Sequence, residues 1–278
     1  MYNSSYQHAV PVALTIAGSD SSGGAGIQAD LKTFSALQVY GASVITAVTA
    51  QNTLGISAIH SIPSSNIAAQ LRAVLLDLDV KAIKIGMLGE SSAVDAVAGV
   101  LHEFCCPLVV IDPVMLSKSG NVLLHPDALA LMKKRLFPLT TVFTPNLPEA
   151  AALAGFSEPT SLSEMYQILE PLHELGVPWV LLKGGHLPAE EQAIDLLSDG
   201  KRVFELRADR YITQNTHGTG CTLSSAIAAG LAKGLDVERS VRKAKQYVTA
   251  AIAAADSLEV GGGHGPLHHF SLLWSQKG

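Results

Sequence analysis

Short apolar runs alternate with amphipathic helical patterns along most of this 278-residue chain. Strands that are joined one after another by helices lie parallel in a sheet, and the helices cover both of its faces. The alternation therefore predicts an α/β fold of three layers (α/β/α) around a mostly parallel central sheet. The predicted strands span 10–17, 43–50, 56–62, 82–88, 108–114, 141–144 and 179–183. The predicted helices span 27–37, 67–78, 92–104, 126–136, 147–154, 163–175, 223–231 and 237–255.

The alternation changes near residue 193. Residues 193–198 and 201–206 have the pattern of two strands, and the Asp199-Gly200 pair between them suits a tight type I′ turn. Such a hairpin adds antiparallel strands at one edge of the sheet. The sequence contains no internal repeat and no interdomain linker, so we expect residues 11–278 to form one domain behind a loose N-terminal tail of residues 1–10.

The composition excludes several classes of protein. With 48% hydrophobic residues, 15% charged residues and a formal net charge of −5, the chain has no electrostatic reason to bind nucleic acid or an anionic membrane. It has neither an apolar run of bilayer length nor a signal-peptide pattern. The three cysteines fit a reducing compartment rather than a disulfide framework. We expect a cytoplasmic protein in which Cys105 and Cys106 are core thiols.

Polar residues and glycines interrupt the apolar strands at their predicted carboxyl ends. Sheets of this kind bind ligands where loops leave those ends. The loops in these positions are 18–26, 51–53, 86–88, 112–120, 145–149 and 183–186. The sequence therefore predicts a ligand site at one edge of the sheet.

The turn Gly218-Thr219-Gly220-Cys221 precedes a helix with Leu223, Ile227 and Leu231 on one face. Glycines allow backbone conformations that a side chain would forbid. The free N–H groups of the first helical turn and the positive end of the helix dipole form an anion site. A cysteine placed there should ionise more readily than a free thiol. The alternative is a glycine turn that only caps a helix, and we assign the adjacent His217 a structural role.

The first loop contains Gly24-Ala25-Gly26-Ile27-Gln28-Ala29, which matches the loose dinucleotide-binding pattern. A dinucleotide site also needs an acidic residue or an arginine about twenty positions further on. After Asp30 the next acidic residue is Asp77, and the first arginine is Arg72. The loop lacks the lysine of a P-loop as well. What remains is a polar loop with Asp20 at the strand end, suited either to a small hydrogen-bonding substrate or to capping the next helix.

Two carboxylates at the same edge are candidates for a metal site. Asp112 directly follows an apolar strand, where an unpaired charge is costly, and Glu149 stands three residues after Asn146 at a helix start. Asn146 and Glu149 also fit a helix-capping box, and Asp112 fits a turn. The metal interpretation is a hydrated Mg²⁺ held by the two carboxylates. Lys183, at another strand end, suits neutralisation of a phosphate.

Several long motifs occur together between about residues 12 and 274. They are TIAGSD at 15–20, SGGAGIQAD at 22–30, AQNT at 50–53, KIGML at 84–88, DPVM at 112–115, TPNLPEA at 144–150, KGGH at 183–186 and NTHGTGCT at 215–222. With these motifs the chain resembles the hydroxymethylpyrimidine and phosphomethylpyrimidine kinases of thiamine biosynthesis, which belong to the ribokinase-like superfamily.

The resemblance implies a ribokinase-like fold and an ATP-dependent kinase. Its substrate would be 4-amino-5-hydroxymethyl-2-methylpyrimidine, converted to the monophosphate and then to the diphosphate. The resemblance also implies a homodimer. Because no second domain follows in this sequence, we expect no fused thiamine-phosphate synthase. The implied site residues are Gln51, Asp20 and Met87 for the pyrimidine; Lys183, Thr216 and Asn146 for ATP; Asp112 and Glu149 for Mg²⁺; and Gly218, Gly220 and Cys221 for catalysis.

Two other functions fit the same sequence. A pyridoxal or pyridoxine kinase would share the fold, the ATP site and the cysteine. A catalytically silent metabolite-binding protein would share the fold, although the set Asp112, Glu149, Lys183 and Cys221 speaks against it. The substrate preference separates the first alternative, and turnover separates the second.

Overall fold

The computed structural model describes residues 10–104, 108–116, 120, 123–185, 187 and 190–274. Cys105, Cys106 and His186, and all of the expected N-terminal tail except Val10, lie outside these residues. The predictions made for them are therefore not addressed by the structure.

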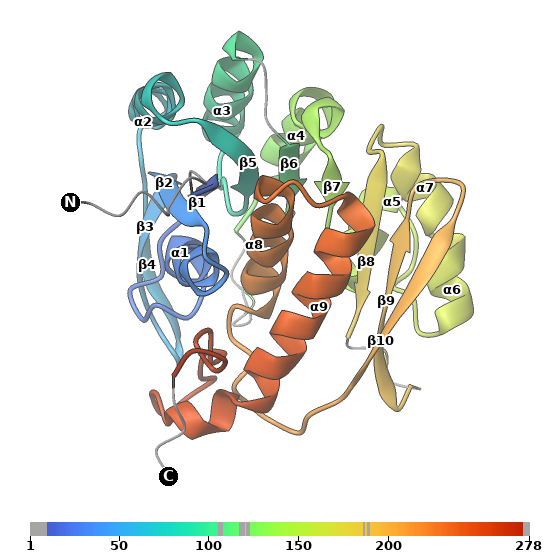
Figure 1. The fold of residues 1–278 in the computed structure, drawn as a ribbon. Helices are drawn as coiled ribbons and strands as arrows, with labels where there is room; N and C mark the ends of the chain where they lie inside the picture. Colours follow the sequence, from blue (N-terminus) through green and yellow to red (C-terminus); the bar gives the residue numbers. More distant parts are fainter. Residues whose placement is uncertain are drawn as a thin grey trace, which may run out of the picture.

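An eight-stranded sheet runs through the described part of the chain in the order β10-β9-β8-β7-β6-β5-β1-β2 (Figure 1). Its strands are β1 (Val12–Ala17), β2 (Tyr40–Ile45), β5 (Val80–Ile85), β6 (Leu108–Ile111), β7 (Val142–Phe143), β8 (Trp179–Gly184), β9 (Gln192–Ser198) and β10 (Val203–Asp209). In this order, neighbouring strands from β8 through β7, β6, β5 and β1 to β2 pair in parallel. β9 is antiparallel to both β8 and β10. The mostly parallel sheet and its antiparallel edge hairpin are thus confirmed.

Helices cover both faces of this sheet. They are α1 (Gly26–Ala36), α2 (Ser64–Asp77), α3 (Ser91–Glu103), α4 (Pro126–Arg135), α5 (Leu147–Ala154), α6 (Leu162–Gln167), α7 (Leu169–His173), α8 (Thr219–Ala232) and α9 (Val237–Ala253), with short 3₁₀ turns at Phe137–Leu139 and Ala255–Leu258. Helices α1, α8 and α9 pack on one face, and α2 to α7 on the other (Figure 1). No helix in the described ranges combines the length and the apolar character needed to cross a membrane.

Each central strand supplies both hydrophobic cores, because successive side chains point to opposite faces. Ala82 and Val110 enter the core beneath α8 and α9, whereas Ile83 and Ile111 enter the core beneath α3 and α4. Strands buried on both faces need continuous apolar runs. The three-layer α/β/α prediction is confirmed.

The predicted single strand 43–50 is wrong. The chain bends at Thr46, between β2 and a further strand β3 (Ala47–Asn52), and β3 pairs antiparallel with β4 (Gly55–Ser61) in a separate two-stranded sheet. At the bend, the Thr46 hydroxyl donates to the Met87 carbonyl at 2.7 Å. The apolar pattern continues across this bend, so periodicity could not locate it. As a result, Gln51 lies on a two-stranded ribbon rather than at the end of a sheet strand.

The predicted helix 163–175 is two helices, α6 and α7. Pro171 has no N–H group, and its ring would collide with the carbonyl of Gln167 in a continuous helix. The helix accordingly ends at Gln167 and restarts at Leu169.

The turn of the edge hairpin is not of type I′, which needs positive φ at both central residues. Gly200 has φ of 81°, but Asp199 is not among the residues with positive φ. Instead, Asp199 Oδ1 accepts the N–H groups of Lys201 and Arg202 at 2.9 and 2.7 Å. The side chain of Asp199 thus closes the turn that its backbone was expected to form.

A buried ion pair joins four elements beneath the carboxyl edge of the sheet. Lys84 Nζ on β5 lies 2.8 Å from Asp30 Oδ2 on α1, and both side chains are fully buried. Asp30 also accepts the hydroxyl groups of Thr15 on β1 and Ser225 on α8, each at 2.6 Å. Burial would lower the pKa of Lys84, but the charge and hydrogen bonds of Asp30, together with the electrostatic effects of Cys221 and Asp112, outweigh burial and raise it. Lys84 is therefore a permanent cation.

We predict that Lys84→Met lowers the free energy of unfolding by about 3–5 kcal/mol, because it leaves the Asp30 carboxylate buried without its counter-ion. Urea denaturation followed by circular dichroism measures this change. The matched control is Arg72→Met, which removes an exposed ion pair with Glu103 and should change stability little. Equal effects of the two substitutions would contradict the prediction.

Candidate active site

The residues predicted for the site meet at the carboxyl edge of the sheet. Asp20 follows β1, Met87 follows β5, Asp112 follows β6 and Asn146 follows β7, while Lys183 is the next-to-last residue of β8. Helix α8 also begins at this edge, since a hydrogen-bond network ties its first turns to β1 and β5 through Asp30. The predicted ligand edge is therefore the place where candidate side chains and a helix N-terminus come together.

The glycine turn at the start of α8 contacts both sides of this edge. Gly218 has φ of 79°, and a Cβ there would lie 1.9 Å from the Gly24 carbonyl oxygen. A Cβ on Gly220 would lie 3.2 Å from Asp112 Oδ2 and 3.3 Å from Lys183 Nζ. Only glycine at position 218 allows the contact with the Gly24 carbonyl. The closeness of Gly220 to Lys183 places the N–H groups of the first helical turn next to a cation. Thr216, two residues before Gly218, accepts the Thr219 hydroxyl through its carbonyl at 2.8 Å.

Three ionisable side chains lie beside this turn. Lys183 Nζ is 2.7 Å from Asp112 Oδ1, and Asp112 is 2% exposed. Burial would lower the pKa of Lys183, but Asp112 and Glu149 outweigh burial and raise it. Burial raises the pKa of Glu149 to about 7, with Lys183 opposing the shift and Asp112 adding to it. The cluster therefore carries the Lys183 cation, and Glu149 is partly protonated near pH 7, so a bound cation would displace its proton.

Asn146 and Glu149 form the capping box that their spacing allowed. The Asn146 side chain accepts the Glu149 N–H, and Glu149 Oε2 accepts the Asn146 N–H, both at 2.8 Å. In the described ranges no three His, Cys, Asp or Glu side chains gather as a metal site would need. Asp112 and Glu149 together would leave most positions on an ion to water and phosphate oxygens. Mg²⁺ accepts such a set, so the residues fit it.

A second group of residues surrounds the first loop. Asp20 is 1% exposed, and its Oδ2 lies 2.8 Å from Nε2 of His217. The Gln51 amide nitrogen lies 3.2 Å from the same ring nitrogen. Met87 packs against Gly18 at the start of this loop, where a Cβ on Gly18 would lie 2.3 Å from Met87 Cε. The three residues assigned to the pyrimidine thus lie around one loop.

His217 was assigned a structural role from the sequence, yet it contacts two of the predicted substrate residues. The neighbouring glycines Gly218 and Gly220 were the sequence signal that this region belongs to the site. Its partner Asp20 lies 197 positions away, so no local spacing predicts their contact.

The expectation that Cys221 ionises readily is wrong. Burial raises the pKa of its thiol to about 11, although Lys84 opposes the shift. The nearby carboxylates Asp30 and Asp112 raise it further. The helix N-terminus does not compensate for desolvation and two negative charges. Cys221 is therefore a neutral thiol at pH 7.

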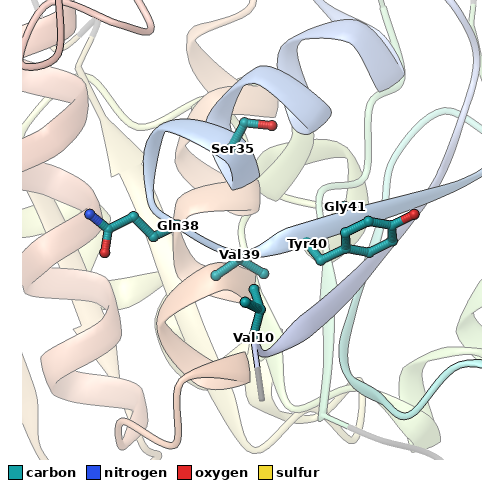
Figure 2. A pocket seen from close by; sticks show the side chains of 6 residues that line it. All are labelled: Val10, Ser35, Gln38, Val39, Tyr40 and Gly41. Atoms are coloured by element: carbon teal, nitrogen blue, oxygen red, sulfur yellow. The ribbon is translucent and has the colours of Figure 1, made fainter. Parts of the chain in front are cut away.

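A surface hollow of about 480 Å³ lies away from these residues (Figure 2). It is lined by Val10, Ser35, Gln38, Val39, Tyr40 and Gly41. These residues stand at the amino-terminal ends of β1 and β2 and at the end of α1. The hollow is therefore at the opposite end of the strands from the candidate site.

Comparisons with known proteins agree with the motifs. The family model described as phosphomethylpyrimidine kinase matches residues 20–268. A hydroxymethylpyrimidine/phosphomethylpyrimidine kinase from Rhizobium meliloti is 54% identical over 95% of this chain and 98% of its own. The thiamine biosynthesis bifunctional protein ThiED from Geobacter sulfurreducens is 48% identical over 92% of this chain, which corresponds to 51% of its own length. An ADP complex of Bacillus subtilis pyridoxal kinase superposes with a TM-score of 0.87 at 38% identity, covering 95% of this chain and 99% of that one.

We predict that Glu149 makes the protein less stable as the pH rises. The folded pKa of about 7 exceeds the ordinary value of 4.5, so the folded protein binds more protons than the unfolded chain between these values. The free energy of unfolding then falls as the pH rises through this window, by about 3 kcal/mol in all for this residue.

Glu149→Gln removes this dependence while it keeps an oxygen for the Asn146 N–H. Urea denaturation of both proteins from pH 4 to pH 8 measures the difference, and their shared groups cancel. The two proteins should be most alike at the acid end. Parallel stability curves for the two proteins would show that Glu149 does not hold the proton.

Proposed function

The chain belongs to the phosphomethylpyrimidine kinase family, and we propose that the site at the carboxyl edge carries out two successive phosphoryl transfers from ATP. The first forms the monophosphate of 4-amino-5-hydroxymethyl-2-methylpyrimidine, and the second converts this to the diphosphate used in thiamine biosynthesis. The observation that carries the proposal is the direct contact between the first loop, at Gly24, and the helix turn, at Gly218. A ring-binding region and a phosphate-binding region therefore adjoin.

The ring would be recognised by Gln51, Asp20 and Met87. A carboxamide supplies a donor and an acceptor together, which is the pattern that an aminopyrimidine edge needs. Met87 supplies a polarisable apolar surface for the ring. The hydroxymethyl group of a ring held there would point toward the start of α8.

The transferring phosphoryl group would lie at the N-terminus of α8. The N–H groups of the Gly218–Cys221 turn would bind its oxygens, and Lys183 would offset their charge. In the first transfer the hydroxyl oxygen of the substrate bonds to the γ-phosphorus while the bond from that phosphorus to ADP breaks, and the hydroxyl proton passes to a phosphate oxygen and on to solvent. In the second transfer an oxygen of the monophosphate takes the place of the hydroxyl oxygen. Such a reaction depends mainly on positioning and charge stabilisation. Cys221, neutral at pH 7, would position the two reacting groups rather than remove the hydroxyl proton in advance.

Asp112 and Glu149 would hold Mg²⁺ with the phosphates of ATP, and the ion would neutralise phosphate charge. Binding would displace the proton of Glu149 and weaken the pairing of Asp112 with Lys183. Asn146 and Thr216 would then border the nucleotide from α5 and from the loop before α8.

Pyridoxal kinase activity is the second candidate, since the Bacillus subtilis enzyme shares the fold closely. The fold does not separate the two substrates. The identity of 54% to the Rhizobium meliloti kinase, against 38% to the pyridoxal kinase, favours the pyrimidine.

The deciding experiment measures kcat/KM for the pyrimidine alcohol, for its monophosphate and for pyridoxine in an ADP-coupled assay, with diphosphate product identified by mass spectrometry. We expect turnover of both pyrimidines and a preference for them over pyridoxine. A preference for pyridoxine without any diphosphate would overturn the assignment, and binding without ADP release would indicate a silent binding protein.

We further predict that Gly218→Ala lowers kcat/KM by roughly 10²–10³, the scale on which a lost oxyanion donor acts. The added methyl group would meet the Gly24 carbonyl oxygen and displace the turn. Gly234→Ala is the matched control, because Gly234 has almost the same φ, 80°, with nothing within 4 Å of the added Cβ. Both variants carry backbone strain, so kcat/KM values within threefold of each other would contradict a role of the turn.

A further inference from the structure

His217 connects the two halves of the site through its side chain. It immediately precedes Gly218, yet its Nε2 lies 2.8 Å from Asp20 Oδ2 and 3.2 Å from the Gln51 amide nitrogen. The His217 side chain is 13% exposed and that of Asp20 is 1% exposed. The residue that precedes the Gly218–Cys221 turn therefore contacts Asp20 and Gln51, two of the side chains that would recognise the ring.

The hydrogen between His217 and Asp20 belongs to the imidazole. Asp20 Oδ1 accepts the N–H and the hydroxyl of Ser22 at 2.9 and 2.7 Å, and Oδ2 accepts the N–H groups of Gly24 and Ala25 at 3.0 and 2.8 Å. Burial would raise the pKa of Asp20, but the hydrogen bonds from His217, Ser22 and the Ala25 N–H, together with the electrostatic attraction of His217, outweigh burial and lower the pKa. An ionised carboxylate only accepts hydrogen bonds. The Nε2 atom of His217 must therefore carry the hydrogen.

This state leaves the amide N–H groups of Gln51 for a ligand, while the Gln51 side-chain oxygen accepts the Thr49 hydroxyl at 3.3 Å. A ring nitrogen either donates or accepts, never both. When Nε2 donates to Asp20, it has no lone pair to accept from the Gln51 amide. The Gln51 amide N–H groups that face His217 then have no acceptor in the imidazole. A heterocyclic nitrogen or an oxygen of a bound substrate can accept from them instead.

The backbone around His217 holds the ring in this position. A Cβ on Gly24 would lie 2.6 Å from His217 Cδ2, so the ring lies directly on the backbone of the first loop. The His217 N–H donates to the Gly265 carbonyl at 3.0 Å. The imidazole is thus held by its own backbone and by the first loop, and its Nε2 donates to Asp20.

We propose that His217 is a positioning residue for ring recognition: its Nε2–H bond to Asp20 holds the first loop and Gln51 in place relative to the Gly218–Cys221 turn. The inference rests on the proposed function. It predicts that the reach of the donor at residue 217 matters more than its chemical type.

The test compares H217Q with H217N. Both variants carry a carboxamide, but only the glutamine extends its nitrogen about as far as Nε2. Loss of one hydrogen bond to a charged group corresponds to a weakening of about tenfold or more. We therefore expect H217N to raise KM for the pyrimidine alcohol about tenfold or more while KM for ATP stays within about threefold, and H217Q to restore KM for the alcohol to within about threefold of wild type.

Calorimetric titration of the pyrimidine alcohol without ATP gives a second readout, in which Kd should follow the same order. H264N is the control, because the His264 side chain is exposed and contacts the Gln214 carbonyl, away from Asp20 and Gln51; it should leave both KM values unchanged. If H217N fails to fold, H217M replaces it, since methionine keeps the length and removes the donor.

Equal KM values for H217N and wild type would overturn the inference. So would equal losses in H217N and H217Q, or parallel changes in the KM values of both substrates, because each indicates a role in packing alone. A wild-type protein that neither binds nor phosphorylates the pyrimidine alcohol would instead refute the proposed function, and with it the role assigned to His217.

Discussion

The ion pair between Lys84 and Asp30 is the constraint on which the carboxyl edge of the sheet depends. A fully buried charge is tolerated only when its partner and its remaining hydrogen bonds are in place. Here those bonds come from Thr15 on β1 and Ser225 on α8. The requirement to satisfy one carboxylate therefore sets α1 and α8 relative to the two central strands, and α8 carries the turn that faces the site.

Above this pair, the two glycines of the helix turn allow close contacts in the site, and the contact of Gly218 is too close for any side chain. Gly218 adjoins the Gly24 carbonyl, and Gly220 adjoins Asp112 and Lys183. Small residues place helix N–H groups beside a cation on one side and beside a polar loop on the other. The same crowding desolvates Cys221, which is why its thiol holds its proton in spite of the helix N-terminus.

Much of this arrangement could be predicted from the sequence. Apolar runs of strand length located most of the sheet, and the general position of ligand sites in parallel sheets located the loops. Two classes of feature escaped. Boundaries inside continuous apolar patterns, as at Thr46, carry no change of period. Contacts between distant segments, as between His217 and Asp20, have no sequence spacing at all. The prediction that Cys221 ionises readily was wrong for a related reason, since desolvation of the thiol depends on neighbours that the fold brings close.

The separation of these partners has a consequence for how the protein is made. Asp30 and Ser225 are 195 positions apart, and Asp20 and His217 are 197 apart. A chain emerging from the ribosome completes β1 to β8 long before α8 exists, and domains generally gain structure from the N-terminal side during synthesis. Until residues 217–225 emerge, Asp20 lacks its imidazole and the Lys84–Asp30 pair lacks a cover. The helix turn of the candidate site therefore joins the rest of the site late in translation, together with the burial of the Lys84–Asp30 pair.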